Sequence, residues 1–510
     1  MEKGGCFLKK IIQVVLFITS AILLLYGLQT VIGQQFLGIL SVIFSILAIL
    51  TSFVIFLENR HPTKTITWLI VLGVFPIVGF MFYILFGRNV RKNKLFQEKA
   101  MIDEKTFQKI EGTRFQTKEI PHYIDEHQMR LFRLAQRLGK SPVSSKTYSE
   151  VLTNGDGTFS KIIEVLKEAN HHIHLEYYIV RDDKIGCEIK EILIEKAKSG
   201  VEVRFLYDGV GSWKLSNEYI LDLKEAGVEI IPFSPVRLAF LNHKVNFRNH
   251  RKIIVVDGKK GFVGGLNIGD EYLGRNEHFG FWRDTHLYLY GEAVRSLQLI
   301  FLQDWYYMTG EKMLTTNYLT PAYVETKENG GVQLISGGPD NEWEVIKNLF
   351  FEMIVSAKKS ISIATPYLIP DVDILSALKI ASLAGIDVKI IIPKRPDKKI
   401  VFYASRSYFP ELLEAGVKVF EYEKGFMHSK FLIIDDDLAS IGTSNLDMRS
   451  FHLNFEVNAY LYQSQSIKSL VLDFQEDLAQ STEIHYDSFS KRPLRQRLVE
   501  SLSRLLSPLL

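Results

Sequence analysis

Two stretches decide the fold: NHRKIIVVD at residues 249–257 and MHSKFLIID at residues 427–435. Each holds a histidine, then a lysine, then an apolar run that is typical of a buried strand, and each ends in an aspartate. An asparagine lies 15 residues after the lysine in both copies. Such repetition predicts one active site that is built from two half-sites. Its members are His250, Lys252, Asp257 and Asn267 in the first copy and His428, Lys430, Asp435 and Asn445 in the second.

The segments around the two stretches repeat the same order of elements. Helix, strand, helix, strand, helix and strand are predicted at 161–170, 172–180, 189–199, 201–207, 221–226 and 228–233, and again at 346–356, 360–366, 375–384, 386–392, 411–415 and 417–422. The phrases KEAGVEIIPF (224–233) and LEAGVKVFEY (413–422) make the repetition visible. Glycine just after a helix predicts a left-handed cap. The pattern predicts two duplicated α/β domains that face each other.

The chain has 510 residues, which is too long for one core and predicts two or three domains. We expect a membrane-embedded part at 1–90, a connector at 91–135, the first α/β domain at 136–325 and the second at 326–485. The tail at 486–510 places leucines among arginines, and this basic amphipathic pattern is typical either of a helix on anionic lipid or of a helix packed on the protein.

Three N-terminal runs carry no charged residue: 11–32, 36–57 and 66–86. At 1.5 Å per residue each is about 30–33 Å long as a helix, which matches the apolar thickness of a bilayer. Basic residues flank all three runs except at the link 33–35, so we expect two crossings, with the catalytic part in the cytoplasm. The third run contains Pro76 and Gly79, and we expect it to be re-entrant or interfacial.

Composition narrows the class of ligand. The net charge of +3 gives no support for a nucleic-acid-binding protein. The lysines of the repeated motif would repel a cation, so the motif predicts no metal and no cofactor. Alternate residues of a strand point the same way, so each histidine projects together with its lysine. Two imidazoles and two ammonium groups around one point suit a phosphate group.

The chemistry of these groups predicts phosphodiester transfer. One imidazole can attack phosphorus while the other protonates the leaving oxygen, and the amides of Asn267 and Asn445 can donate to phosphate oxygens. Each imidazole needs an orienting partner. We expect Asp284 to orient His250 and Glu456 to orient His428. Asp257 and Asp435 follow their strands, and we expect them to hold the following turns by local hydrogen bonds.

The two motifs resemble the HKD motifs of the phospholipase D superfamily. The stretches NHRKIIVVDGKKGFVGGLNIGDEYLG (249–274), FWRDTHL (281–287) and GFMHSKFLIIDDDLASIGTSNLDMRSFHLNFEVN (425–458) are similar to those of bacterial cardiolipin synthases, and so is the front end at 58–88. The resemblance covers nearly the whole chain. It implies two phospholipase D-like α/β/α sandwich domains that form one active site, preceded by transmembrane helices in a bacterial cell membrane.

The resemblance also implies a reaction. A phosphatidyl group would pass from one phosphatidylglycerol to another, giving cardiolipin and glycerol through a phosphohistidine intermediate without metal. By analogy His250 would be the nucleophile and His428 the general acid. The residues alone leave open a membrane phospholipase D that hydrolyses lipids to phosphatidic acid. They also leave open the preferred acyl chains, the oligomeric state and the regulation.

Overall fold

The computed structural model describes residues 34–57, 62–76, 79, 80, 83, 87, 126–234, 246–313, 315–320 and 330–510. The chain divides into two compact units. Unit 1 comprises Met1–Asn89 and Leu238–His243, and unit 2 comprises Val90–Arg237 and Lys244–Leu510. The candidate site residues all belong to unit 2.

Unit 1 contains α2 (Gln34–Leu57) and α3 (Pro62–Val74). The two helices pack through a small core of Ala48, Ile55, Leu72 and Tyr83. Helix α2 coincides with the second predicted membrane segment, α3 covers the first part of the third, and the first at 11–32 lies outside the described residues. No helix in the described part of the chain has the length and hydropathy that a membrane crossing requires. The predicted crossings therefore remain predictions.

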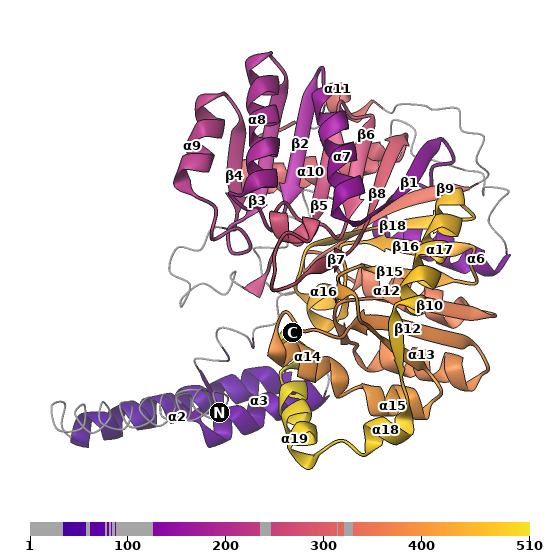
Figure 1. Ribbon diagram of the computed structural model, residues 1–510. Helices are drawn as coiled ribbons and strands as arrows, with labels where there is room; N and C mark the ends of the chain where they lie inside the picture. Colours follow the sequence, from indigo (N-terminus) through magenta and orange to yellow (C-terminus); the bar gives the residue numbers. More distant parts are fainter. Residues whose placement is uncertain are drawn as a thin grey trace, which may run out of the picture. The chain divides into compact units, whose positions relative to one another are not determined.

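The first half of unit 2 is built on a seven-stranded sheet (Figure 1), with strand order β1-β8-β6-β5-β2-β3-β4. Neighbours from β1 to β2 run antiparallel, whereas β2, β3 and β4 run parallel. The strands are β1 (Thr147–Thr153), β2 (His172–Tyr177), β3 (Glu202–Asp208), β4 (Glu229–Phe233), β5 (Lys252–Val256), β6 (Lys260–Gly264) and β8 (Thr285–Gly291).

The second half repeats this sheet and adds one edge strand. Its order is β9-β18-β16-β15-β10-β12-β13-β19, with the same parallel and antiparallel pairs in the first seven strands. The predicted duplication of α/β domains is confirmed. The strands are β9 (Gly331–Gly337), β10 (Ser360–Ala364), β12 (Asp387–Pro393), β13 (Lys418–Tyr422), β15 (Phe431–Ile434), β16 (Leu438–Gly442), β18 (Glu456–Tyr462) and β19 (Ser481–Ile484).

Helices cover the outer face of each sheet. The first sheet carries α7 (Asn154–Lys167), α8 (Lys184–Lys198) and α9 (Asn217–Glu225), and the second carries α12 (Val345–Ser356), α13 (Val372–Leu383) and α15 (Phe409–Glu414). Six helices were predicted at these places. The glycines that end α8 and α13, Gly200 and Gly385, have φ values of 93° and 94°, as left-handed caps require.

The inner faces of the two sheets share one hydrophobic core. Apolar side chains of β5, β6 and β8 belong to the same buried cluster as those of β15, β16 and β18. Helices α10 (Val294–Thr309) and α17 (Gln465–Ala479) contribute to this cluster. The two halves therefore form one compact body, and their facing strand ends are held at a fixed separation.

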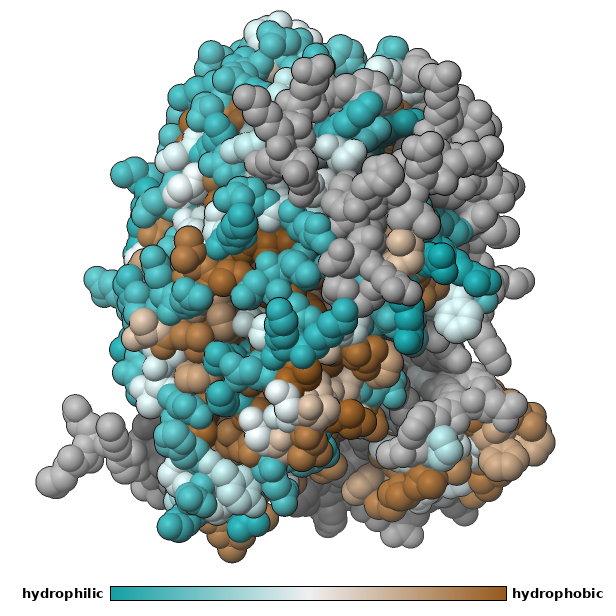
Figure 2. All heavy atoms as spheres, turned by 90° about the vertical axis from the view of Figure 1, so that its right-hand side faces the viewer, coloured by the Kyte–Doolittle hydropathy of each residue, from teal (hydrophilic) through white to brown (hydrophobic). Residues whose placement is uncertain are grey.

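The surface of unit 2 is not uniform. On the face shown in Figure 2, hydrophobic residues gather over the lower part of this unit, where its second half lies. Helix α13 in that half exposes Val372, Ile380 and Leu383.

The remaining elements are β7 (Phe281–Arg283), β11 (Leu368–Ile369), β14 (Gly425–Met427), β17 (Leu446–Asp447), η4 (Asp270–Leu273), η5 (Ser507–Leu509), α6 (Glu126–Gly139), α11 (Thr316–Leu319), α14 (Lys399–Arg406), α16 (Met448–His452), α18 (Tyr486–Ser490) and α19 (Leu494–Arg504).

The motif aspartates tie each half-site strand to its neighbour. The carboxylate of Asp257, at the end of β5, accepts hydrogen bonds from the backbone N–H groups of residues 170–172, at distances between 2.8 and 3.3 Å. Asp435, at the end of β15, accepts from residues 358–360 at 2.7–2.9 Å. The prediction of local hydrogen bonds was wrong, because the partners start the neighbouring strands β2 and β10. These contacts support the expected structural role, and the carboxylates lie at the strand ends remote from the histidines.

We predict that Asp435→Ala lowers the free energy of unfolding by roughly 1–3 kcal/mol, because three backbone N–H groups lose a charged acceptor. Denaturant unfolding of the purified chain, followed by tryptophan fluorescence, measures the change. Asp436→Ala is the matched control, because the exposed Asp436 has a similar left-handed backbone, with φ of 60° against 51° for Asp435. Equal losses for the two variants would show that backbone strain, not the hydrogen bonds, sets the cost.

Candidate active site

Two short pairings between the halves bring the motif histidines together. Strand β14 runs parallel to β7, and the backbone N–H of His428 donates to the carbonyl oxygen of Arg283 at 2.7 Å. In the other half-site the backbone N–H of His250 donates to the carbonyl oxygen of Phe455 at 2.9 Å. Each histidine is therefore anchored to a strand of the opposite half. The predicted convergence of the two half-sites follows from this backbone pairing.

The acid that holds each imidazole comes from the opposite half. Nδ1 of His250 lies 3.0 Å from Oε2 of Glu456, and Nδ1 of His428 lies 2.6 Å from Oδ2 of Asp284. The two acids were identified correctly as partners, but the predicted pairing was wrong. The reason lies in the backbone, because Asp284 and Glu456 directly follow Arg283 and Phe455, whose carbonyl oxygens bind the opposite histidines.

These hydrogen bonds decide which ring nitrogen can react. A carboxylate that accepts from Nδ1 fixes the proton on that nitrogen and leaves Nε2 for a ligand. Both Glu456 and Asp284 are fully buried. Burial raises the pKa of each carboxyl, but the nearby histidine and lysines outweigh burial and lower the pKa. Both acids are therefore charged and stabilise a positive imidazole.

Two buried lysines provide the positive charge of the site. Nζ of Lys252 donates to the carbonyl oxygen of His250 at 2.6 Å, and Nζ of Lys430 donates to the carbonyl oxygen of His428. Burial lowers the pKa of Lys252 to about 7 and that of Lys430 to about 8, although nearby acids oppose the change. Each lysine is thus close to losing its proton near neutral pH, and an anion between them would restore the charged form.

Burial also keeps the two imidazoles neutral in the free site. Burial and the neighbouring lysines together lower the pKa of His250 to about 4 and that of His428 to about 3, although Glu456 and Asp284 oppose the change. A neutral imidazole can act as a nucleophile at once, whereas a general acid must first take up a proton. A bound phosphate anion would raise the pKa of both rings, because its charge favours the protonated form.

The predicted phosphate-binding asparagines are engaged in hydrogen bonds within the protein. Oδ1 of Asn267 accepts from the backbone N–H of Ile179 at 3.0 Å, and its Nδ2 lies 3.2 Å from the hydroxyl of Tyr272. Nδ2 of Asn445 donates to Asp447 at 3.1 Å. Both asparagines are buried. The structure places them in the loops after β6 and β16, and phosphate binding by their amides stays a prediction.

The half-sites differ in what surrounds each acid. Glu456 accepts a hydrogen bond from Oγ1 of Thr443 at 2.6 Å. The corresponding position beside Asp284 is Gly265, where a Cβ would lie 2.0 Å from Oδ1 of that carboxylate. Aromatic rings also differ. Tyr178 contacts the His250 ring with centroids 5.0 Å apart, whereas Trp282 lies 4.9 Å from His428. The two imidazoles therefore have unequal environments despite the repeated motif.

Two buried arginines, which were not predicted from the sequence, stabilise the contact between the two half-sites. Arg251 pairs with Asp304 and donates from Nε to the carbonyl oxygen of Glu456 at 3.1 Å. Nε of Arg283 lies 2.8 and 2.9 Å from the carboxylate oxygens of Asp477. Each arginine thus joins an element of one half to the other half. The sequence did contain a signal for these two arginines, because Arg251 directly follows the motif histidine His250 and Arg283 directly precedes the acid Asp284.

Comparison with protein families gives two matches. A model described as "Cardiolipin synthase, PLD-like domain" matches residues 162–305 and 350–478. A model described as "Phospholipase_D-nuclease N-terminal" matches residues 46–88. The first model matches once in each half, and its two matches cover both motifs and most strands of each sheet.

Curated relatives match almost end to end. The chain is 63% identical to a cardiolipin synthase of Geobacillus sp. over 504 residues, which cover 99% of this chain and 100% of the relative. It is 61% identical to a cardiolipin synthase of Alkalihalophilus pseudofirmus over 503 residues, with the same coverage. Among solved structures, phosphatidylserine synthase of Haemophilus influenzae covers 75% of this chain and all of its own, with 18% identity and a TM-score of 0.58. That likeness concerns the fold alone.

We predict that the site binds sulfate, a dianion that keeps its charge between pH 6 and 9, and that it does so with declining affinity as the pH rises. The sign follows from Lys252 and Lys430, whose pKa values of about 7 and 8 mean that both lose their charge over this range. Isothermal titration calorimetry measures the dissociation constant. Lys252→Met should weaken binding by about 10–100-fold, the equivalent of one charged hydrogen bond.

The exposed Lys198 provides the matched control for this substitution. Lys198→Met should leave sulfate affinity and its pH dependence unchanged. An affinity that rises with pH, or an equal loss in the two variants, would contradict the placement of the anion between the two buried lysines.

Proposed function

The chain belongs to the family of cardiolipin synthases with phospholipase D-like domains, and from this we propose that it transfers a phosphatidyl group from one phosphatidylglycerol to a second, releasing glycerol. One structural observation supports the proposal above all: each motif imidazole is held by the backbone and the acid of the opposite half. Two histidines that are fixed in this way can act on one phosphorus atom from opposite sides.

The first chemical step breaks the bond between phosphorus and the glycerol headgroup. Nε2 of neutral His250 attacks phosphorus, and the ammonium groups of Lys252 and Lys430 stabilise the added negative charge. His428 gives its proton to the departing glycerol oxygen. It can hold that proton because the bound phosphate raises its pKa and Asp284 stabilises the charged ring. The products of this step are free glycerol and a phosphatidyl group on His250.

The second step reverses the roles of proton donor and acceptor. Neutral His428 takes the proton from the free hydroxyl of a second phosphatidylglycerol, and the resulting oxygen attacks phosphorus. The bond between phosphorus and Nε2 of His250 breaks, which restores the free imidazole. One phosphodiester replaces another, so the exchange is close to isoenergetic and needs no nucleotide. Water in place of the second lipid would yield phosphatidic acid, so the buried site favours transfer by limiting water.

The assignment of roles follows the unequal surroundings of the two rings. Glu456 and Thr443 hold His250 in one orientation, as a nucleophile requires. Nζ of Lys430 lies 2.9 Å from Nδ1 of His428, so a phosphate that binds this ammonium group lies close to the His428 ring. Asp284 and Glu456 act as positioning residues, and Asn267 and Asn445 are proposed to bind phosphate oxygens.

The proposed domain limits are those expected from the sequence. We assign the phospholipase D-like domains to 136–325 and 326–485, the connector to 91–135 and the tail to 486–510; the matched segments at 162–305 and 350–478 support the two domains. The apolar part at 1–90 is proposed to hold the enzyme in the bacterial cell membrane by two crossings at 11–32 and 36–57. The largely exposed apolar side chains of α2 support an apolar surrounding. Phosphatidylglycerol and other anionic lipids are the proposed partners.

Incubation of the purified chain with phosphatidylglycerol as the sole lipid should yield cardiolipin and glycerol in equal amounts. Lipid extraction followed by mass spectrometry measures both products. His250→Ala and His428→Ala should each lower the rate by about 10³-fold or more, since the imidazoles act as one unit. His485→Ala, at an exposed histidine, is the control. Phosphatidic acid as the main product would instead identify a hydrolase.

The same reaction, stopped rapidly with base, tests the choice of nucleophile. Peptide mass spectrometry should find the phosphatidyl adduct on His250. An adduct on His428 would reverse the two roles without affecting the reaction.

Membrane topology can be tested in intact cells with single cysteines in a background that lacks Cys6 and Cys187. Lys94→Cys should react with a membrane-impermeant maleimide only after lysis, because the catalytic part is proposed to face the cytoplasm. Gln34→Cys, in the short link between the two crossings, should react from outside. Labelling of Lys94→Cys in intact cells would overturn the proposed orientation.

A further inference from the structure

Helix α19 is packed with its polar face toward the protein. Glu500 and Ser503 are buried at 1% and 8% exposure. The carboxylate of Glu500 lies 2.7 Å from Nε of Arg492 and 3.8 Å from Nε of Arg406, which belongs to α14. An ordinary surface helix buries its apolar stripe and exposes its charges. In α19 the order is inverted, and the buried ion pairs hold it in that orientation.

The inversion leaves a row of leucines outside. Leu494, Leu498, Leu502 and Leu505 are 69%, 56%, 64% and 75% exposed. Their spacing of three and four residues puts them on one side of the helix. Further contacts fix the helix: Arg504 lies 2.8 Å from a carboxylate oxygen of Glu411. The ion pairs therefore hold the leucine row on the outside of the protein. Its exposure to water is unfavourable unless an apolar environment covers it.

Basic residues surround this row. The tail at 486–510 carries five lysines and arginines against two acids, and one of those acids is the buried Glu500. The loop at 394–399, which leads into α14, carries four basic residues against one acid. After it comes Ile400, which is 51% exposed. Leucines with a positive rim match the interface of an anionic bilayer, where apolar side chains enter the lipid and ammonium and guanidinium groups meet phosphates.

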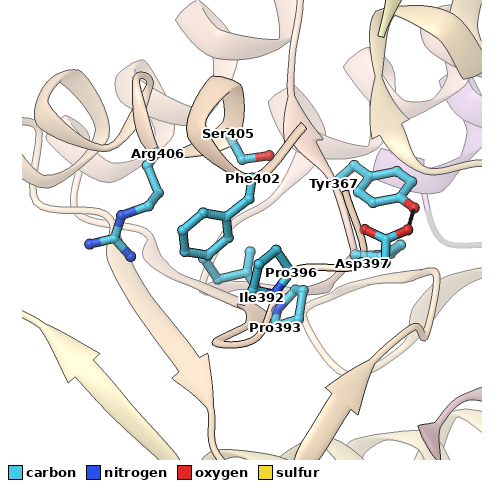
Figure 3. Close-up of a pocket in the computed structure, with 9 residues that line it drawn as sticks. Tyr367, Ile392, Pro393, Pro396, Asp397, Phe402, Ser405 and Arg406 are labelled. Atoms are coloured by element: carbon cyan, nitrogen blue, oxygen red, sulfur yellow. Dashed lines mark hydrogen bonds between the residues drawn. The ribbon is translucent and has the colours of Figure 1, made fainter. Parts of the chain in front are cut away.

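A pocket opens between the basic loop and α14 (Figure 3). It is small, with a volume of about 10 Å³, and mainly apolar groups line it. Its wall includes Ile392 and Pro393 at the end of β12 and Phe402 of α14, while the hydroxyl of Tyr367 bonds to Asp397 at its side. The lining residues are Pro366, Tyr367, Ile392, Pro393, Pro396, Asp397, Phe402, Ser405 and Arg406.

This pocket lies at the ends of β10 and β12, two interior strands of the second sheet. In the ladder, Ala364 at the end of β10 pairs with Phe431 on one side and with Ile391 on the other. Lys430 directly precedes Phe431, and the pocket residues at 366–367 and 392–393 directly follow Ala364 and Ile391. The apolar pocket is therefore next to the second half-site, on the side of α14 and α19.

The end of the chain connects the same region to both half-sites. The backbone N–H of Arg449 donates to the carbonyl oxygen of Leu510 at 3.0 Å, and its guanidinium donates to the carbonyl oxygens of Leu509 at 3.1 Å and of Asn246 at 3.0 Å. Asn246 lies four residues before His250, and α16, which contains Arg449, starts after Asp447, the partner of Asn445. The tail is thus part of the framework of the site.

We propose that the leucine row of α19, together with Ile400 and the basic loop at 394–399, is a lipid-docking surface that lies on an anionic bilayer beside the second half-site. This surface is distinct from the apolar N-terminal part. It rests on the proposed function only in the choice of phosphatidylglycerol as the lipid.

The test uses the full chain with one cysteine, Leu498→Cys, in a background that lacks Cys6 and Cys187, labelled with a polarity-sensitive dye. The chain is compared in phosphatidylglycerol vesicles, in phosphatidylcholine vesicles and in detergent. A blue shift and protection from aqueous iodide are expected in phosphatidylglycerol vesicles and should weaken at high salt. Leu472→Cys on α17 is the matched control, because Leu472 is 62% exposed. Its dye should stay accessible throughout.

Two results would overturn the proposal. A dye at Leu498 that stays accessible to iodide in phosphatidylglycerol vesicles shows that no lipid covers the row. Equal protection in phosphatidylcholine vesicles, at low and high salt alike, shows that the row does not require an anionic bilayer. Neither readout requires turnover. An active enzyme with an accessible dye overturns the docking surface alone, and a protected dye in an enzyme that makes no cardiolipin overturns the proposed function alone.

A kinetic comparison gives an independent readout. The double variant Leu498→Gln, Leu502→Gln should raise the KM for phosphatidylglycerol in vesicles by roughly tenfold or more, because two leucines no longer enter lipid. Its kcat should be unchanged, since neither residue contacts the reacting groups. Leu472→Gln should change neither constant. A fall in kcat at unchanged KM would assign the leucines a structural role and contradict docking.

Discussion

The hydrogen bond between each imidazole and the acid of the opposite half is the interaction on which the structure depends. It exists only because the inner faces of the two sheets share a core and because β7 and β14 pair as parallel strands. Buried arginines then keep these strand ends in register. Without that contact between halves, neither His250 nor His428 would have a fixed ring orientation, and the two Nε2 atoms could not be directed at one group.

A second constraint is electrostatic. Two ammonium groups are buried beside two imidazoles, and this positive cluster is tolerable because Asp284 and Glu456 remain charged. Burial and the lysines together keep the rings neutral until an anion arrives. In the proposed reaction the free site is therefore prepared for attack, and the substrate itself supplies the charge that allows the second ring to be protonated. Substrate binding and proton uptake are thus coupled through the same few groups.

Local pattern was enough to predict much of the fold. Apolar runs ending in Asp257 and Asp435 identified β5 and β15, and the glycines after α8 and α13 marked helix ends, because these features depend on neighbours in sequence. The pairing of each acid with its histidine was predicted wrongly. Which half supplies the acid depends on the pairing of β7 with β14, whose paired residues lie 144 positions apart in the sequence. The inverted packing of α19 was also beyond sequence, because its amphipathic pattern fits either face inward.

Each half supplies the carboxylate that binds the histidine of the other half, and this arrangement has an implication for how the chain evolved. Two identical subunits related by a two-fold axis would make this same exchange, each completing the other. Once both copies were joined in one polypeptide, identity between them was no longer needed. Thr443 stands where the other copy has Gly265, and Glu456 where it has Asp284. Fusion thus allowed the two half-sites to diverge, and the proposed specialisation of one histidine as nucleophile and the other as proton carrier is a difference that the sequence of a symmetric pair cannot encode.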